Sequence, residues 1–239
     1  MEECLERLVG ESERVVFFGG AGVSTESGIP DFRSADGLYR EHSQQRGLYS
    51  PETILSRSFF DAHTAEFFDF YRGKMLCLHA KPNKAHDALA RLEQSGKLLA
   101  VITQNIDGLH QMAGSKRVLE LHGSVHRNSC MDCGRAYPVR DIAQSSGVPR
   151  CACGGVIKPD VVLYEEGLDS GVLTAAANAL RRADLLIIAG TSLAVYPAAG
   201  LVDYYGGREL VVINKTPTRF DRRATLLIQG SVGEALGIQ

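Results

Sequence analysis

The sequence predicts an α/β fold, in which a doubly wound, Rossmann-like parallel sheet carries a smaller inserted module that is partly helical and partly zinc-binding. Apolar runs such as Val15–Phe18 and Leu185–Ala189 each stop at small residues, as buried parallel strands do where they turn into loops. Stretches with helical apolar spacing lie between such runs. From residue 127 to residue 158 this alternation gives way to cysteines, glycines and polar residues. We therefore expect one domain over residues 1–239 with an insertion.

The elements expected in chain order alternate between helices and strands. A short helix over residues 2–10 leads into the strand Val15–Phe18, and aromatic residues indicate a helical region over about 51–78. A further helix starts near Asn83 and ends at Gly96. The remaining elements are the strands Leu98–Thr103, Val118–Leu121 and Leu210–Ile213, the extended segment Val161–Tyr164, and a helix through Leu173, Ala177 and Leu180. The Rossmann-like part then comprises about 1–33, 80–126 and 159–239, and the small module about 34–79 (helical) and 127–158 (zinc-binding).

Composition excludes several classes of function. A formal net charge of −2 provides no basic surface for nucleic acid or for an anionic membrane. The N-terminal residues are acidic and too poor in apolar side chains for a secretory signal, and no run approaches the length of a membrane span. We expect a cytoplasmic protein and a monomer.

The glycine-rich stretch Gly20-Ala21-Gly22 directly follows the first strand. Without a Cβ, these glycines allow backbone N–H groups to approach a phosphate, and the Thr25 hydroxyl lies close by in sequence. The pattern is also compatible with a plain tight turn, and Thr25 stands where a dinucleotide fingerprint has its third glycine. A long loop follows in place of the usual helix, which disfavours a hydride-transfer dehydrogenase.

Four cysteines gather in the inserted module as Cys130-x-x-Cys133 and Cys151-x-Cys153, and glycines follow each pair. Four thiolates at this spacing are typical of a structural zinc site that folds a module too small for a core of its own. Two disulfides or unpaired thiols are the alternatives, and disulfides are disfavoured because no secretory signal precedes them. Cys4 and Cys77 are expected to be ordinary buried thiols.

Five blocks resemble, in order, the signature of the sirtuins, which are NAD-consuming protein deacylases. They are Gly20 to Arg33, Thr103 to His110, Leu121-His122-Gly123, Gly190 to Leu193, and Ile213-Asn214. With the cysteine cluster between the third and fourth blocks, the resemblance spans nearly the whole chain. It identifies a bacterial-type sirtuin that consists of the catalytic core alone.

The resemblance implies an NAD-dependent protein-lysine deacetylase, which transfers the acetyl group of acetyl-lysine to ADP-ribose and releases nicotinamide. It implies His122 as the general base, a role that suits an imidazole because it titrates near neutrality, and assigns catalytic roles to Asn105 and Asp107. Taken alone, a histidine at a strand end such as His122 is usually structural, and polar residues such as Asn105 and Asp107 at a strand's carboxyl end usually cap the helix that follows. A non-catalytic NAD or ADP-ribose sensor and an ADP-ribosyltransferase remain alternative functions, and other acyl groups remain open.

The resemblance also assigns the binding residues. Acetylated-lysine proteins or peptides are held as a β-strand between two protein segments, to which Val161, Val162, Leu163, Tyr164 and Val195 contribute. Phe32 shields the reacting sugar carbon from water. The NAD-binding residues are Gly20, Ala21, Gly22, Thr25, Phe32, Arg33, Gln104, Asn105, Ile106, Asp107, His122, Gly190, Thr191, Ser192, Asn214, Lys215 and Val232.

Three features depart from the family pattern. The second cysteine pair is Cys-x-Cys, and Tyr164-Glu165-Glu166 replaces the usual Phe-Gly-Glu, so that Glu165 adds a charge that favours substrates with basic flanks. Sirtuins that remove succinyl groups grip the distal carboxylate with a Tyr-x-x-Arg pair, whereas this chain has Tyr71 and Lys74. Lysine lacks the forked geometry of arginine, so we expect acetyl to be preferred over succinyl.

Overall fold

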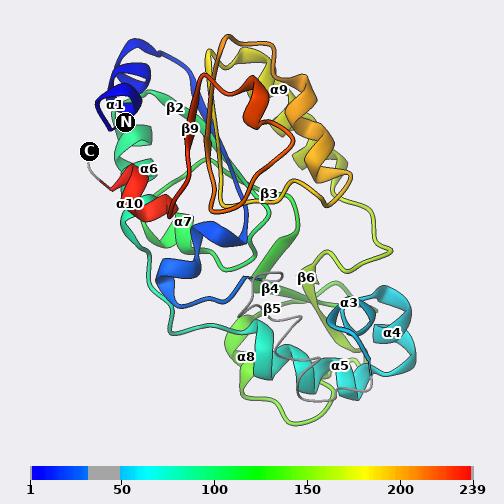
Figure 1. The fold of residues 1–239 in the computed structure, drawn as a ribbon. Helices are drawn as coiled ribbons and strands as arrows, with labels where there is room; N and C mark the ends of the chain where they lie inside the picture. Colours follow the sequence, from blue (N-terminus) through cyan, green and yellow to red (C-terminus); the bar gives the residue numbers. More distant parts are fainter. Residues whose placement is uncertain (1, 32–48, 238–239) are drawn as a thin grey trace.

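The computed structural model describes residues 2–31 and 49–237, which form a larger and a smaller lobe (Figure 1). The larger lobe is built on a six-stranded parallel sheet with the order β3-β2-β1-β7-β8-β9. Taken along the chain, this is third-second-first-fourth-fifth-sixth, the Rossmann order, so the predicted α/β class is confirmed. The strands are β1 (Val15–Gly19), β2 (Leu98–Thr103), β3 (Val118–Glu120), β7 (Leu185–Ala189), β8 (Glu209–Ile213) and β9 (Leu226–Ile228).

Strand β1 lies at the centre of the sheet and is buried along its whole length. Its residues pair in parallel with β2 on one side and β7 on the other. Because side chains alternate between the two faces of a strand, Val16 and Phe18 enter one apolar core while Val15 and Phe17 enter the other. A strand buried on both faces needs a continuous apolar run, which is what made this one recognisable from the sequence.

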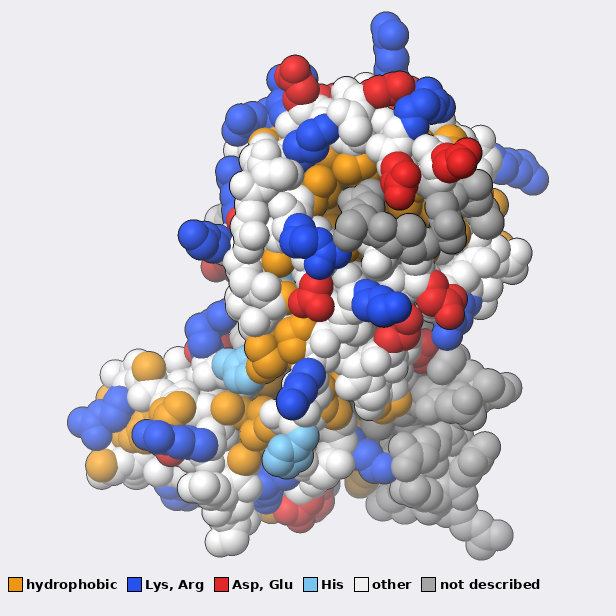
Figure 2. Space-filling model, turned by 90° about the vertical axis from the view of Figure 1, so that its left-hand side faces the viewer, with side chains coloured by type: hydrophobic (Ala, Val, Ile, Leu, Met, Phe, Trp, Pro, Cys, Tyr) orange, Lys and Arg blue, Asp and Glu red, His pale blue; other side chains and the backbone are white. Residues whose placement is uncertain are grey.

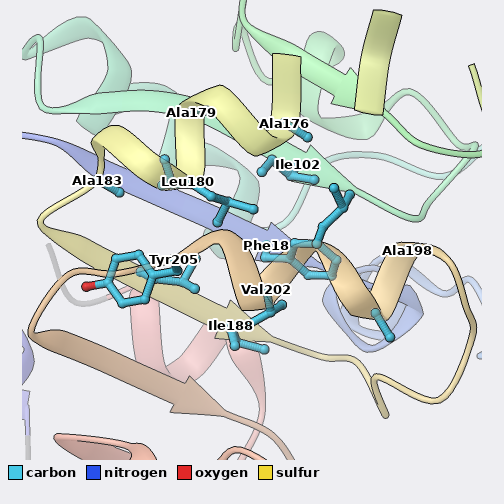
Figure 3. Packing of buried hydrophobic residues seen from close by; sticks show 14 of the residues in the cluster. Phe18, Ile102, Ala176, Ala179, Leu180, Ala183, Ile188, Ala198, Val202 and Tyr205 are labelled. Atoms are coloured by element: carbon cyan, nitrogen blue, oxygen red, sulfur yellow. The ribbon is translucent and has the colours of Figure 1, made fainter. Parts of the chain in front are cut away.

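Helix α9 (Ser170–Arg182) and the 3₁₀ segment η4 (Ala198–Tyr204) cover one face of the sheet. Figure 3 shows Leu180 and Val202 from these elements directed toward Phe18 and Ile188 of the strands. Asp169 begins α9 by accepting a hydrogen bond from Val172 N at 2.8 Å. The other face packs against α1 (Glu2–Glu11), α6 (Lys84–Gln94) and α10 (Val232–Leu236).

The smaller lobe combines a three-stranded antiparallel sheet with short helices, seen at the bottom of Figure 1. Its core is largely aromatic, with Phe60, Phe67, Phe68 and Tyr71 in mutual ring contact. The strands have the order β5-β4-β6. The elements are α3 (Pro51–Ile54), α4 (Arg57–Ala62), α5 (Thr64–Phe70), the π-helical turn η3 (Tyr71–Met75), β4 (Gly123–Cys130), β5 (Ala136–Pro138), α8 (Val139–Ala143) and β6 (Ile157–Val161).

Several predicted elements differ from the observed ones in extent. The helical region over 51–78 is divided because Ser50 and Ser56 each accept a backbone N–H and so begin a new helix. Of the predicted extended segment Val161–Tyr164, only Val161 belongs to strand β6, and Tyr164 forms an isolated bridge with Ser56. The sequence did not predict strand β9 or helix α10. The small sheet also crosses the expected module boundaries, since β4 begins at Gly123 and β6 ends at Val161.

Two further short helices are η1 (Ala21–Val23) and η2 (Thr25–Ser27), which follow β1, and α7 (Leu109–Met112) follows β2. Across residues 2–31 and 49–237, no helix combines the length and the apolar character that crossing a bilayer requires.

Candidate active site at the carboxyl end of the parallel sheet

A cavity of about 870 Å³ lies where the two lobes meet. Its walls include the loops that follow β1 and β7, at the point where the strand order reverses, together with Leu55 and Tyr164 beside the small lobe. Figure 2 shows the waist between the lobes, with hydrophobic side chains and histidines gathered along it. Open α/β sheets bind ligands at this switch point.

The glycines after β1 and β7 let these two loops touch. Gly22 N donates a hydrogen bond to Gly190 O at 2.8 Å, and Gly190 has a positive φ of 59°. A Cβ on Gly22 would lie 2.7 Å from Gly190 Cα, so a side chain there would push the loops apart. The predicted glycine loop is thus part of a tight contact whose outer side, at Ala21 and Gly22, lines the cavity. Gly20 instead lies behind this surface, against Thr191 and Gln104.

Gln104, at the end of β2, is fixed by the loop after β7. Its Oε1 accepts a hydrogen bond from Thr191 Oγ1 at 2.8 Å. Thr191 Oγ1 also accepts one from Leu193 N at 3.1 Å. Residues predicted from two separate motifs therefore form one connected set at the cavity wall.

A chain of hydrogen bonds joins Asn105 and Asp107 through Ser24. Asn105 Nδ2 donates to Ser24 Oγ at 3.0 Å, and Ser24 Oγ donates to Asp107 Oδ2 at 2.7 Å. The other carboxylate oxygen of Asp107 accepts a hydrogen bond at 2.9 Å from the N–H of Leu109, the first residue of α7, while Gly108 is the N-cap residue. The same Asp107 carboxylate therefore binds a backbone N–H at the start of α7 and lines the cavity, so a structural role and a role in the site are compatible.

His122 lies between β3 and β4 and lines the cavity. Its Nδ1 is 2.9 Å from the Gln104 carbonyl oxygen, which can only accept a hydrogen bond. Nδ1 therefore carries the proton, and Nε2 is the basic nitrogen of the neutral ring. Burial lowers the pKa of His122, and the bond to the Gln104 carbonyl opposes this shift. The geometry thus keeps the imidazole neutral with its basic nitrogen defined.

Residues from η2, from the loops after β7 and β8, and from α10 complete the wall beside η1. Ser192, Asn214, Lys215 and Val232 line the cavity, as does Thr25. Asn214 Nδ2 donates to Thr216 O at 2.8 Å, which orients its amide. Ile106 and Gly190 also line the cavity.

The segment after β6 forms the opposite rim. Val161, Val162, Leu163, Tyr164 and Val195 all line the cavity. Val162 N donates to the His122 carbonyl at 3.0 Å, which ties this rim to the histidine. Tyr164 pairs through its backbone with the small lobe, because its N–H donates to Leu55 O at 2.9 Å and its carbonyl accepts Arg57 N at 3.0 Å.

The four predicted cysteines come together in the small lobe, where Cys130 ends β4. The Sγ atoms of Cys130, Cys133, Cys151 and Cys153 all lie within 4.8 Å of one another. Sulfur atoms at the corners of a tetrahedron, each about 2.3 Å from a central zinc ion, are separated by distances of this order. The Cys-x-Cys pair therefore permits a closed four-thiolate site, and its residues fit zinc.

Hydrogen bonds around Cys151 support a thiolate there. The Tyr137 hydroxyl donates to Cys151 Sγ at 3.0 Å. The backbone N–H of Cys153 and this hydroxyl lower the pKa of Cys151 to about 6. Metal ligands commonly have such a second set of partners, which orients the ligand and stabilises its charged form.

The chain matches the Sir2 family model over residues 20–197. It belongs to the Sir2 family. An NAD-dependent protein deacetylase from Clostridium perfringens is 57% identical over 235 residues, covering 98% of this chain and 96% of the relative.

Two solved Sir2 structures have the same fold. One is a Sir2 variant with a deacetylated p53 peptide and 3'-O-acetyl ADP ribose, at a TM-score of 0.89 and 41% identity over 98% of this chain and 95% of that one. The other is Sir2 with a p53 peptide and NAD⁺, at a TM-score of 0.87 and 41% identity over 99% of this chain and 95% of that one. The predicted sirtuin membership is confirmed.

The predicted set of residues for this Sir2-family site differs from the observed one in three respects. Phe32 and Arg33 lie outside the described residues. Ser24 was left out of the predicted set although it links Asn105 to Asp107; a serine next to the glycine loop was the available signal. Cys77 is half-buried and lines the cavity, where an ordinary buried thiol was expected.

Tyr71 belongs to the core of the small lobe. Its side chain is fully buried in the aromatic core of the small lobe, stacked on Phe67, and is not part of the cavity wall. Lys74 does line the cavity. Of the Tyr71 and Lys74 pair compared with the carboxylate grip of other sirtuins, only Lys74 therefore stands at the cavity wall.

Proposed function

We propose that this protein is an NAD-dependent protein-lysine deacetylase. Relatives that cover nearly the whole chain carry that name, and the cavity brings the predicted NAD and peptide segments together. One observation carries the proposal: the hydrogen bond from His122 Nδ1 to the Gln104 carbonyl, which leaves Nε2 as a base at the cavity wall. A protein that only sensed NAD would have no use for a histidine held neutral in this way.

NAD, when bound, supplies a nicotinamide leaving group and a ribose that receives the acetyl group. His122 then acts as the general base, taking the proton of a sugar hydroxyl on Nε2 while the Gln104 carbonyl stabilises the proton on Nδ1. Since burial lowers the pKa of His122, the neutral form is available below the usual titration range of histidine.

Asp107, Asn105 and Gln104 position the reacting groups. Ser24 Oγ and Leu109 N hold the Asp107 carboxylate, whose remaining lone pairs would accept the carboxamide of nicotinamide. Thr191 fixes the Gln104 amide, which would contact the ribose, and Asn105 is oriented through Ser24. These side chains stand on strand ends of the sheet, which provides the rigidity that positioning requires.

The binding residues divide between the two substrates. Ala21, Gly22 and Thr25 would hold the phosphates of NAD, while Asn214, Lys215 and Val232 would hold its adenosine end. Val161 to Tyr164 on one side and Val195 on the other would hold the acetylated protein segment as an added strand. Zinc would be bound by the four cysteines, where it fixes the fold of the small lobe and takes no part in the reaction.

We also propose that acetyl is preferred over succinyl. Tyr71 is buried away from the cavity, so its phenol is not available to a distal carboxylate. A lysine alone gives a point charge without the bidentate geometry of arginine. The ratio of kcat/KM on matched acetyl and succinyl peptides tests this, and equal values would reject the preference. As partners we propose acetylated-lysine proteins, with the enzyme acting as a cytoplasmic monomer, which chromatography and cell fractionation check.

Nicotinamide release from NAD, measured with and without an acetyl-lysine peptide, is the deciding experiment for the activity. Release that requires the peptide and matches the free lysine formed supports a deacetylase. Release that ignores the peptide would favour an ADP-ribosyltransferase or a hydrolase. Binding of NAD without any release, with every acyl peptide, would favour a sensor.

A further inference from the structure

Glu165 occupies an unusual backbone position at the rim of the cavity. Its φ is 75°, one of two positive values among the non-glycine residues that the structure describes. Side chains with a Cβ rarely adopt this left-handed conformation. Glu165 is exposed and lines the cavity next to Tyr164.

The Glu165 side chain is tied to the small lobe. Its Oε2 accepts a hydrogen bond from Ser58 N at 2.9 Å, and its Oε1 accepts one from Ser58 Oγ at 3.0 Å. On the preceding residue, the Tyr164 backbone bonds to Leu55 and Arg57. Two consecutive residues of the rim are therefore fixed to the junction between α3 and α4.

The two neighbouring glutamates differ in their charge balance. Glu166 is paired with two cations, since its carboxylate lies 3.2 Å from Arg57 NH1 and 3.2 Å from Lys158 Nζ. Within the described part of the chain, no ion pair includes Glu165, and its donors on Ser58 are uncharged. The rim thus presents one carboxylate whose charge is not compensated by a neighbouring cation.

We propose that Glu165 determines substrate specificity by favouring acetylated peptides that carry Lys or Arg beside the acetyl-lysine. The inference rests on the proposed function, because it places the peptide along the rim formed by Val161 to Tyr164. Glu165 borders that rim and holds its carboxylate in one place through Ser58. A cationic side chain of the peptide gains Coulomb energy there, and an acidic one is repelled.

The expected discrimination is modest because the carboxylate is exposed. An exposed ion pair typically changes the binding affinity by roughly two- to five-fold. Screening should reduce this, since the Debye length falls from about 10 Å at 0.1 M salt to about 3 Å at 1 M. Discrimination by shape or hydrogen bonding would not depend on salt in this way.

The test uses three matched acetyl-lysine peptides that differ only in flanking residues, which are Lys, Ala or Glu. Peptide Kd is measured by fluorescence anisotropy at low and high salt, and nicotinamide release is measured in parallel. For the unmodified protein we expect the lysine-flanked peptide to bind tightest and the glutamate-flanked one weakest at low salt. For Glu165→Gln, the amide oxygen still accepts from Ser58, and the preference should disappear.

Ser58→Ala is the matched control, because it keeps the charge and removes one of the two bonds that hold it. Because the charge remains and Ser58 N still binds it, the order of the three peptides should be kept. Glu165→Gly removes the charge and the strained side chain together, so it should show no charge preference and no loss of thermal stability.

The two outcomes separate the inference from the function on which it rests. Peptides that bind with a salt-sensitive preference lost in Glu165→Gln, but without nicotinamide release, would support the inference and reject the deacetylase. Turnover of all three peptides with a preference unchanged in Glu165→Gln, or a preference that persists at 1 M salt, would overturn the role of Glu165.

Discussion

The two lobes are stabilised in different ways. The larger lobe buries apolar side chains on both faces of its parallel sheet, in two separate clusters. The smaller lobe has one cluster, and two of its four clustered cysteines, Cys130 and Cys151, belong to that cluster. The larger lobe therefore has two apolar cores of its own, whereas the smaller lobe depends in addition on what holds its cysteines together.

The active site depends on this difference. Gln104, Asn105 and Asp107 follow β2 of the larger lobe, while the peptide rim at Tyr164 is fixed to the smaller one. In the proposed function, the residues that position the chemistry therefore stand on the lobe with two cores of its own, and the peptide rim at Tyr164 is attached to the lobe that carries the cysteine cluster. Substitutions in the two lobes should therefore differ in whether they affect mainly the fold or mainly the reaction rate.

Zinc removal should have the largest effect. We expect Cys151→Ser, or treatment with a chelator, to unfold the smaller lobe and to abolish deacetylation, because apparent binding energies of structural zinc reach about 10–16 kcal/mol. Hydrogen exchange should then increase in β4 and β6 while β1 and β7 stay protected. Metal analysis should give one zinc per chain for the unmodified protein, and Cys4→Ser is the control outside the cluster. Full metal content in Cys151→Ser would contradict the four-thiolate site.

His122→Ala should have the next largest effect. In contrast to zinc removal, it should reduce the reaction rate and leave the fold of both lobes intact. A general base contributes a factor of about 10² to 10⁴ to the rate, so kcat should fall by about that factor or more. Thermal unfolding and NAD affinity should remain close to those of the unmodified protein. His63→Ala, at an exposed helix end of the smaller lobe, should have little effect on kcat. Near-normal turnover in His122→Ala would remove this residue from the mechanism.

Sequence reasoning succeeded where a pattern is forced by burial. Val15–Phe18 and Leu185–Ala189 had to be continuous apolar runs because both faces of the sheet are covered, so their strands were predicted nearly to the residue. The three-residue strand β9 contains Leu227, which is exposed, and so gave no comparable pattern.

The sequence predicted which motifs contribute residues to the site, but it did not predict the contacts between those residues. Nothing in the sequence states that Ser24 bridges Asn105 and Asp107, since these residues are joined only by the parallel pairing of β1 with β2. The resemblance compared Tyr71 and Lys74 with the Tyr-x-x-Arg pair of the family, but only Lys74 lines the cavity; both belong to the π-helical turn η3, whose spacing differs from that of an α-helix. Such turns depend on tertiary packing.

His110 provides a smaller effect, confined to the larger lobe. It is fully buried between Phe17 and His86, and burial, with His86 second, lowers its pKa to about 3. Between pH 6.5 and 3 the unfolded chain therefore binds a proton that the folded chain does not. The stability that His110 provides is complete above about pH 6.5 and is lost as pH falls, by at most about 1.4 kcal/mol per pH unit.

Denaturant unfolding at several pH values checks this. His110→Leu should give a shallower decline of the free energy of unfolding between pH 6.5 and 4, whatever its stability at pH 7. His126→Ala, a change at an exposed histidine, should keep the original slope. An unchanged slope in His110→Leu would show that other groups account for the acid sensitivity.

Tyr71→Phe should have the smallest effect, and it distinguishes a core residue from a specificity residue in the smaller lobe. The Tyr71 hydroxyl is buried, and among the described residues it has no hydrogen-bond partner. Burial raises the pKa of this phenol, in line with an apolar surrounding. Removing the hydroxyl leaves the ring stack on Phe67 in place, so stability should change by less than about 1 kcal/mol. The ratio of kcat/KM for acetyl over succinyl peptides should stay constant. Lys74→Met is the comparison, because Lys74 lines the cavity and its loss should raise that ratio. A ratio that shifts in Tyr71→Phe and not in Lys74→Met would mean that the phenol reaches the acyl group during catalysis, through a movement of η3.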